Sequence, residues 1–287
     1  MKPLIKSRYI GRLGNKLFQL AAAIGYAKKY NVGWGIKKGY VEKGFNVKQV
    51  DRFMPHLPAC DSYFKPYTEF QDKWAGEEFN YHEIPFFPNG VELVGFWQSY
   101  KYFENAEKEV REAINISYKE GYQDYTSIHI RRGDYVNLDT NFPPVNFSYI
   151  AQAMLKFLDN QKYLVFSDDI EWCKQNINGN VEFYQGTNEW DDLCTMASCG
   201  HNIIANSSFS WWAGWLNKNP NKIVVSPSCK WGNWFGISAG VKIDCVDLLP
   251  PTWEQIEFRT IDREAYKENT EQETQRWIKL SRNGNIR

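Results

Sequence analysis

The chain has 287 residues, with 34 Lys or Arg against 34 Asp or Glu, so its formal net charge is zero. This balance argues against a protein that wraps nucleic acid or lies on an anionic membrane through bulk charge. Aromatic residues form 16% of the chain; much of this must fill a core, and the surplus favours flat platforms for a carbohydrate or base ligand.

In the first part of the chain, apolar stretches alternate between strand-like and helix-like patterns. The sequence predicts a strand over residues 4–10 and a helix over 14–30, where apolar residues recur at helical spacing. Residues 32–88 are aromatic and interrupted by prolines, and they predict no clear element. A strand at 91–96 and a helix at 100–114 follow.

From residue 125 onward, the alternation of strands and helices becomes clearer. Strands are predicted at 127–131, 163–166, 181–184, 201–205 and 223–225, and helices near 147–158, 170–175, 189–199 and 209–216. Continuous apolar strands that are each followed by a helix are typical of parallel βαβ units. The sequence therefore predicts an α/β fold with two doubly wound domains that meet at a cleft. We expect the domains to be residues 1–122 and 123–287, with a charged helix at 263–279.

Cysteine usage and the first residues of the chain favour a cytoplasmic location. The six cysteines are scattered, form no C-x-x-C pair and are too sparse for a disulfide scaffold, so we expect reduced, mostly buried thiols. Polar residues interrupt residues 1–26, which are expected to be neither a secretion signal nor a membrane span. Peripheral association with the inner face of the membrane stays open.

The first turn with candidate function is Gly11-Arg12-Leu13-Gly14-Asn15-Lys16, between the first strand and the first helix. Glycines allow a backbone to approach a ligand closely, and a helix N-terminus presents N–H groups to an anion. Arg12 and Asn15 could add donors. An ordinary tight turn is the alternative, and the absence of G-K-[ST] excludes a P-loop.

Charged residues gather at the end of the strand predicted at 127–131, in the run His129-Ile130-Arg131-Arg132-Gly133-Asp134-Tyr135. Strand alternation puts His129 and Arg131 on the same face. Ligands of open α/β sheets bind at the carboxyl ends of strands, where arginines suit bidentate capture of a diphosphate. The alternative is a salt-bridged turn, in which Asp134 pairs with Arg131 or Arg132.

Two further strand ends carry polar residues. After the strand at 163–166, Asp168 could bind a ribose hydroxyl or a guanine edge, whereas Asp169 could cap the helix that follows. The strand at 201–205 leads into the run Asn206-Ser207-Ser208-Phe209-Ser210-Trp211-Trp212. Hydroxyls at a helix start can cradle a phosphate and can also cap the helix. No spacing of His, Cys, Asp or Glu predicts a metal site, and no hydrolase or redox motif is present.

Five motifs follow one another within residues 8–245: Gly11-x-Leu13-Gly14-Asn15-x-Leu17-Phe18-Gln19, Gly95-Phe96-Trp97-Gln98-Ser99-x-Lys101-Tyr102-Phe103, His129-Ile130-Arg131-Arg132-Gly133-Asp134-Tyr135, Phe166-Ser167-Asp168-Asp169 and Ile204-Ala205-Asn206-Ser207-Ser208-Phe209-Ser210-Trp211-Trp212. Together they resemble glycosyltransferase family 11, the α-1,2-fucosyltransferases of bacterial surface glycans and animal H-antigen synthesis. The resemblance implies a GT-B-like pair of Rossmann-type domains, with the acceptor on the N-terminal side and GDP-L-fucose on the C-terminal side. It also implies inverting transfer of fucose to O2 of a terminal β-galactoside, without a metal or other cofactor.

The resemblance further implies which residues contact the donor. It puts Arg12, Gly14 and Asn15 on the diphosphate and fucose, Arg131 on the diphosphate and His129 near the nucleoside. The remaining expected donor contacts are Arg132, Asp168, Ser207, Ser208, Phe209 and Ser210.

The expected catalytic residues are Arg131 and Asp134. Arg131 would stabilise the charge that grows on the leaving diphosphate. Asp134 is the nearest carboxylate to act as the base, although the arginine-rich turn would weaken it in that role. The expected acceptor walls, which could equally be core packing, are Trp74, Phe86, Phe87, Phe96, Trp97 and Gln98.

Overall fold

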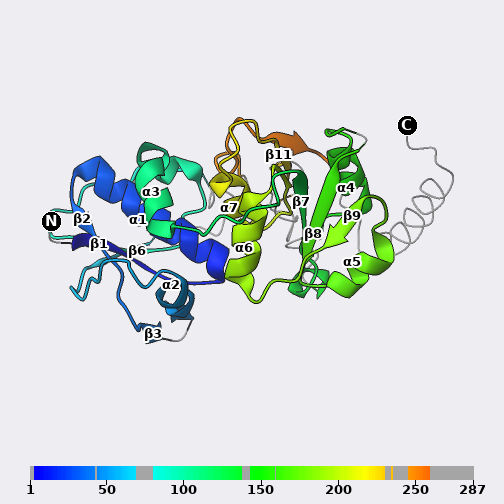
Figure 1. Ribbon diagram of the computed structural model, residues 1–287. Helices are drawn as coiled ribbons and strands as arrows, with labels where there is room; N and C mark the ends of the chain where they lie inside the picture. The colour runs from blue at the N-terminus through cyan, green and yellow to red at the C-terminus, as the bar shows by residue number, and fades with distance from the viewer. Residues whose placement is uncertain are drawn as a thin grey trace. The chain divides into compact units, whose positions relative to one another are not determined.

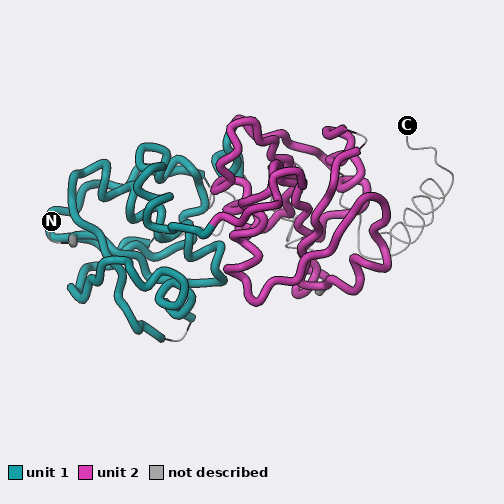
Figure 2. The backbone as a smooth tube through the Cα atoms, viewed as in Figure 1, with its two compact units in different colours: residues 1–117, 244–250 teal, residues 118–243, 251–287 magenta. Residues whose placement is uncertain are grey.

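The computed structural model (Figure 1) describes residues 3–42, 44–68, 80–137, 143–158, 160–229, 234 and 245–258. The chain divides into two compact units (Figure 2): unit 1 holds residues 1–117 and 244–250, and unit 2 holds residues 118–243 and 251–287. The division falls a few residues before the boundary expected after residue 122, and the sequence did not predict the return of residues 244–250 to unit 1. The helix expected at 263–279 lies outside the described residues.

Unit 1 is built on a parallel four-stranded sheet. The strands are ordered β2-β1-β6-β5, and their bounds are β1 (Pro3–Arg8), β2 (Gly33–Trp34), β5 (Pro66–Thr68) and β6 (Val91–Val94). β1 and β6 are the central neighbours, paired in parallel from Ile5–Val91 to Arg8–Val94. The turns that follow these two strands therefore lie at the same carboxyl edge of the sheet.

Helix α1 (Leu13–Tyr30) fills the core of unit 1. It is rich in Ala and Leu, which favour helix, and nearly every residue from Leu13 to Ala27 is buried. It ends at Asn31, whose left-handed backbone (φ 52°) returns its N–H to the carbonyls of the last turn. Among the described residues, no helix is long and apolar enough to cross a membrane.

The remaining elements of unit 1 lie around α1 and the sheet. They are the hairpin β3 (Val41–Glu42) and β4 (Phe45–Asn46), α2 (Lys48–Phe53), the 3₁₀ turns η1 (Tyr100–Tyr102) and η2 (Glu104–Ala106), and α3 (Glu107–Ile114). The single helix expected at 100–114 is therefore wrong in its first half. The physical reason is packing: η1 passes so close to α1 that a Cβ on Gly25 would overlap the Tyr102 carbonyl oxygen.

Unit 2 contains a parallel six-stranded sheet, ordered β12-β11-β10-β7-β8-β9. Its strands are β7 (Tyr125–Ile130), β8 (Lys162–Ser167), β9 (Val181–Phe183), β10 (His201–Ile203), β11 (Val224–Pro227) and β12 (Glu254–Ile256). Counted along the unit, this is the order 3-2-1-4-5-6 of dinucleotide-binding sheets. The prediction of an α/β fold with two parallel sheets is confirmed.

Helices connect these strands, and the sheet of unit 2 is buried between them. The helices are α4 (Phe147–Met154), α5 (Ile170–Asn176), α6 (Glu189–Ser198) and α7 (Ser208–Leu216), with a 3₁₀ turn η3 (Asp134–Asn137). Ile128, Val165 and Ile203 at the sheet centre are fully buried, and each such side chain contributes about 1.5–3 kcal/mol. Figure 1 shows β7, β8 and β9 side by side. The strand order reverses between β7 and β10, which makes their carboxyl ends the switch point of the sheet.

Candidate active site

The turn after β7 holds an arginine between two carboxylates. The Arg131 guanidinium donates from Nη2 to Asp134 Oδ1 and from Nη1 to Asp168 Oδ2. The Arg131 side chain is 13% exposed, whereas those of Asp134 and Asp168 are 40% and 26% exposed. The pairing of Asp134 with Arg131, which the sequence left as an alternative, is therefore present, and Arg131 is fixed from two sides.

Asp168 is held within this turn by the backbone as well. Its Oδ1 accepts a hydrogen bond of 2.9 Å from the Arg132 backbone N–H. A Cβ on Gly133 would overlap Asp168 Oδ2, so any larger residue here would displace the Asp168 carboxylate. Asp168 thus orients Arg131 here, and its contact with a ribose or guanine stays a prediction.

The second arginine of the turn has different partners. Arg132 Nε donates to Asp169 Oδ2 at 3.1 Å, and its guanidinium lies 3.6 Å from the centre of the Trp172 ring. Asp169 Oδ1 also accepts from the Trp172 N–H at 3.3 Å, which confirms the expected cap of α5. Arg132 is therefore held against the start of α5.

His129 is a buried, neutral group in the middle of the switch point. It is 6% exposed, and its ring lies 5.7 Å from that of Phe209. Burial lowers the pKa of His129 to about 4, so the imidazole carries no charge at neutral pH. Its Nδ1 has no hydrogen-bond partner within the described residues. Through Nδ1, a neutral imidazole in this position can either donate one hydrogen bond to a polar ligand or accept one from it, depending on its tautomer.

The hydroxyls at the start of α7 differ in their exposure and in their hydrogen bonds. Ser207 caps the helix, since its side chain accepts from the Phe209 N–H at 3.4 Å. Ser210 is fully buried, and its hydroxyl donates to the Ser207 carbonyl at 3.3 Å. Ser208 and Phe209 are partly exposed. Ser207 therefore caps α7. A phosphate at this helix start would be bound by the Ser208 hydroxyl and the backbone N–H groups of the first turn.

Tyr135 connects the turns after β7 and β10. Its hydroxyl donates to the Asn206 carbonyl at 3.2 Å, and the Arg131 guanidinium lies 5.5 Å from the centre of its ring. Asn206 in turn donates from Nδ2 to the carbonyls of Pro143 and Trp234, at 2.8 and 3.0 Å. Sequence reasoning assigned neither Tyr135 nor Asn206 to the site, although both belong to the motifs that carry the resemblance.

In unit 1, the glycine turn after β1 contacts the turn after β6. Gly11 has φ +75°, and Arg12 is exposed at the N-cap position of α1 without a side-chain cap. Gln98 Nε2 donates to Asn15 Oδ1 at 2.7 Å, which orients the Asn15 amide. Gly14 is buried in the first helical turn. The predicted donor contacts therefore form one group in unit 1 and a second group in unit 2.

Only some of the side chains expected to form the acceptor walls are exposed on unit 1. Trp97 is 1% exposed and lies with its ring stacked on Tyr67 at 6.2 Å. Trp97 therefore packs the core of unit 1, and its expected role as a wall is corrected. Phe86 is exposed and Phe87 is partly buried, whereas Trp74 lies outside the described residues.

Metal-ligating side chains are not gathered in the described part of the chain, where no group of three or more His, Cys, Asp or Glu is placed to hold an ion. The adjacent carboxylates of Asp168 and Asp169 each pair with an arginine, Arg131 and Arg132 respectively. Both are thus engaged with cations of the protein itself.

Comparison with known proteins identifies relatives of this chain. The family model described as Glycosyl transferase family 11 matches residues 64–232, more than half of the chain. The chain is 29% identical to the alpha-1,2-colitosyltransferase of Escherichia coli over 307 residues, which cover 88% of this chain and 99% of that protein. It is 25% identical to galactoside alpha-(1,2)-fucosyltransferase 1 of Mus musculus, over 72% of this chain and 61% of that protein. Among solved structures, the fucosyltransferase NodZ from Bradyrhizobium matches with 15% identity and a TM-score of 0.41, over 74% of this chain and 92% of that chain.

Proposed function

Because the chain belongs to glycosyltransferase family 11, we propose that it transfers L-fucose from GDP-L-fucose to O2 of a terminal β-galactoside, with inversion at the anomeric carbon. The observation that supports this most directly is Arg131, fixed between Asp134 and Asp168 at the switch point of the sheet in unit 2. A forked, immobile cation at this edge suits the diphosphate of a sugar nucleotide.

In the proposed reaction, the bond from the anomeric carbon to the diphosphate breaks as O2 of galactose attacks from the opposite face. Negative charge grows on the departing GDP, and donors that are fixed in advance stabilise it. Arg131 and the N-terminal N–H groups of α7 are the proposed donors. Arg131 with its two carboxylates carries a net charge of minus one, so directed hydrogen bonds, and not bulk charge, must hold the diphosphate.

The proton of the attacking hydroxyl needs an acceptor, and we propose Asp134. Its carboxylate lies in the turn after β7 and is 40% exposed, so an acceptor hydroxyl can reach it. Asp134→Asn removes the base and keeps the shape of the side chain; it should lower kcat by a factor of about 10²–10⁴ with little change in donor KM. An effect confined to donor KM would instead make Asp134 a positioning partner of Arg131.

A second candidate is transfer of colitose, supported by the alignment with a colitosyltransferase over 88% of this chain. Colitose is the 3-deoxy analogue of fucose, so the two donors differ by one hydroxyl. A site that hydrogen-bonds this hydroxyl discriminates against the analogue that lacks it by about 10⁴–10⁵, whereas an apolar pocket rejects the extra hydroxyl by only about 10². The ratio of kcat/KM for the two donors therefore separates the candidates.

The test is a matrix of donors and acceptors, with the product linkage read by NMR. GDP-L-fucose, GDP-colitose and GDP-mannose are each combined with lactose and N-acetyllactosamine. We expect an α-L-fucosyl product on O2 of galactose and no product from GDP-mannose. A product on O3 or O4 would contradict the linkage, and turnover with GDP-colitose alone would contradict the donor.

A further inference from the structure

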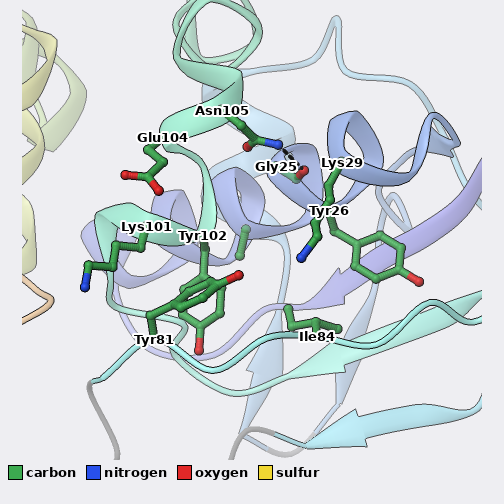
Figure 3. Close-up of a pocket in the computed structure, with 10 residues that line it drawn as sticks. Gly25, Tyr26, Lys29, Tyr81, Ile84, Lys101, Tyr102, Glu104 and Asn105 are labelled. Atoms are coloured by element: carbon green, nitrogen blue, oxygen red, sulfur yellow. Dashed lines mark hydrogen bonds between the residues drawn. The ribbon is translucent and has the colours of Figure 1, made fainter.

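A pocket of about 290 Å³ lies in unit 1 beside the second half of α1 (Figure 3). Its floor includes Gly25, which is twelve residues from Leu13, or about 18 Å along the helix from the glycine turn. We propose that this pocket binds one neutral sugar residue of a glycan, as a site separate from the turns after β1 and β6. The proposal rests on the proposed function only for the choice of a galactoside as its probe.

Two aromatic rings form one corner of the pocket. The centres of the Tyr81 and Tyr102 rings are 5.0 Å apart, and the rings are tilted by 54°. Tyr81 is only partly buried, and its hydroxyl makes no hydrogen bond within the described residues. Figure 3 shows that hydroxyl pointing toward the side of the pocket that carries Lys29. A ring of this kind offers a flat apolar face and a polar tip, which match the C–H face and hydroxyl edge of a pyranose.

The wall opposite α1 is a loop whose backbone is fixed before any ligand binds. The Tyr102 hydroxyl accepts from the His82 N–H at 3.1 Å, and the Tyr30 hydroxyl donates to the Ile84 carbonyl at 2.7 Å. The Tyr26 hydroxyl accepts from the backbone N–H of Phe87 at 2.9 Å. Because these contacts order the loop in advance, a ligand loses little affinity to the cost of ordering it.

The charges around the pocket exclude an anion and favour a neutral ligand. Lys29 pairs with Glu83 at 2.7 Å, and Lys101 pairs with Asp247. Both ammonium groups are therefore neutralised by the protein. Glu104, which also lines the pocket, attracts Lys101 at longer range but forms no ion pair within 4 Å in the described part of the chain. The five charged groups Lys29, Lys101, Glu83, Asp247 and Glu104 therefore carry a net charge of minus one. A carboxylate in this position accepts hydrogen bonds from sugar hydroxyls.

The size of the pocket limits the part of the ligand that it encloses to a single ring. Its volume is at the low end of the roughly 300–1,000 Å³ of small-molecule sites, which admits one pyranose and excludes a nucleotide sugar. Asn105 donates from Nδ2 to the Gly25 carbonyl at 3.3 Å, which fixes its amide at the rim beside Glu104. An apolar ring face, a fixed amide and a nearby carboxylate at the rim match the composition of small-molecule sites, and a saccharide can use all three.

The test follows the methyl resonance of Ile84, which lines the pocket and is 6% exposed. The full-length protein, labelled with ¹³C at isoleucine methyls, is titrated with lactose, with inorganic phosphate and with choline. We expect lactose to shift the Ile84 resonance saturably in the millimolar range, and to leave that of Ile5 in β1 unchanged. Assignment of the resonance comes from Ile84→Val.

Two variants and a matched control locate the binding. Tyr81→Ala should weaken lactose binding at Ile84 about tenfold, the loss of one aromatic contact of roughly 1.4 kcal/mol. Tyr63→Ala removes a tyrosine that is 89% exposed and lies outside the pocket, and should change nothing. Glu104→Gln, at an exposed side chain, should retain lactose binding within about tenfold, because a neutral amide still bonds to hydroxyls.

A saturable shift from phosphate or choline without one from lactose would overturn the proposal, as would the absence of any shift. Equal lactose binding in wild type and Tyr81→Ala would also overturn it. Turnover of GDP-L-fucose is measured separately on the same samples. Loss of the Ile84 shift with normal turnover would refute this inference alone, and a normal shift without turnover would refute the proposed function alone.

Discussion

Replacement of Arg131 by lysine is the sharpest perturbation of the proposed donor site. Lysine keeps the positive charge but replaces a planar fork of donors by a single ammonium group. That group cannot reproduce the paired contacts with Asp134 and Asp168. If Arg131 acts by aiming two donors at the leaving diphosphate, the substitution should reduce catalysis while the net charge of the turn stays the same.

The structure allows the loss of activity to be compared with the loss of stability. Asp134 and Asp168 are 40% and 26% exposed, so solvent screens both pairs and each contributes at most about 1 kcal/mol. A loss of about 1–2 kcal/mol leaves a protein with the usual 5–15 kcal/mol of stability folded. Loss of a fixed donor to developing charge costs about 10²–10³ in rate, or roughly 2.7–4 kcal/mol. The catalytic effect should therefore exceed the structural one.

Release of GDP from GDP-L-fucose in the presence of lactose measures the catalytic effect, and thermal unfolding without ligand measures the structural one. Arg52→Lys is the matched control, since Arg52 is exposed on α2. We expect kcat/KM to fall by about 10²–10³ in Arg131→Lys only. A folded Arg131→Lys with kcat/KM equal to that of the control would refute the role of Arg131.

Three further predictions concern the same region. In Gly133→Ala the new Cβ displaces Asp168 Oδ2. A resulting shift of about 1 Å in the turn that holds Arg131 should lower kcat/KM by about 10² with little change in Tm. Unchanged steady-state kinetics would show that Asp168 does not position the turn. EDTA should leave kcat/KM within about twofold of its value without EDTA. The reason is that Asp168 and Asp169 already pair with arginines, whereas Mg²⁺ needs such carboxylates unoccupied. A large loss that Mg²⁺ restores would contradict this. Burial lowers the pKa of His129 from 6.5 to about 4, so the unfolded chain binds the proton more readily. The free energy of unfolding should therefore fall by about 2.6 kcal/mol as pH drops from 6.5 to 4. Urea unfolding across this range should show that loss in the wild type and not in His129→Gln, and identical slopes would refute it.

The local parts of this fold could be predicted from the sequence. The apolar strand, the glycine turn and the Ala- and Leu-rich helix of residues 4–30 agree with β1 and α1, because each signal lies within a few residues of the structure that it specifies. The charged run after β7 was predicted at a strand end for the same reason. Its partners were not predicted, since Asp168 lies 37 residues beyond Arg131 and a pairing over that distance depends on strand order.

Packing explains the places where the prediction failed. Trp97 looked like a ligand platform, but its left-handed backbone (φ 54°) turns the ring into the core of unit 1. Such a conformation is costly for a bulky residue and exists only because surrounding contacts impose it. The expected helix at 100–114 is likewise broken where Tyr102 and Phe103 pack against α1. Tertiary contacts outweighed helix propensity at residues 100–106, and they set the orientation of the Trp97 ring.

The return of residues 244–250 to unit 1 has a consequence for synthesis on the ribosome. Asp247 accepts from the Tyr81 N–H at 3.0 Å and from the Ser99 hydroxyl at 2.8 Å, through its side chain and its carbonyl respectively. Ser99 is fully buried in the complete chain, and in a nascent chain that ends at residue 117 its hydroxyl would lack this acceptor. Translation of the next 130 residues takes roughly 7–26 s, so unit 1, although first to emerge, reaches its final hydrogen bonding only after residues 118–243 of unit 2 have been translated.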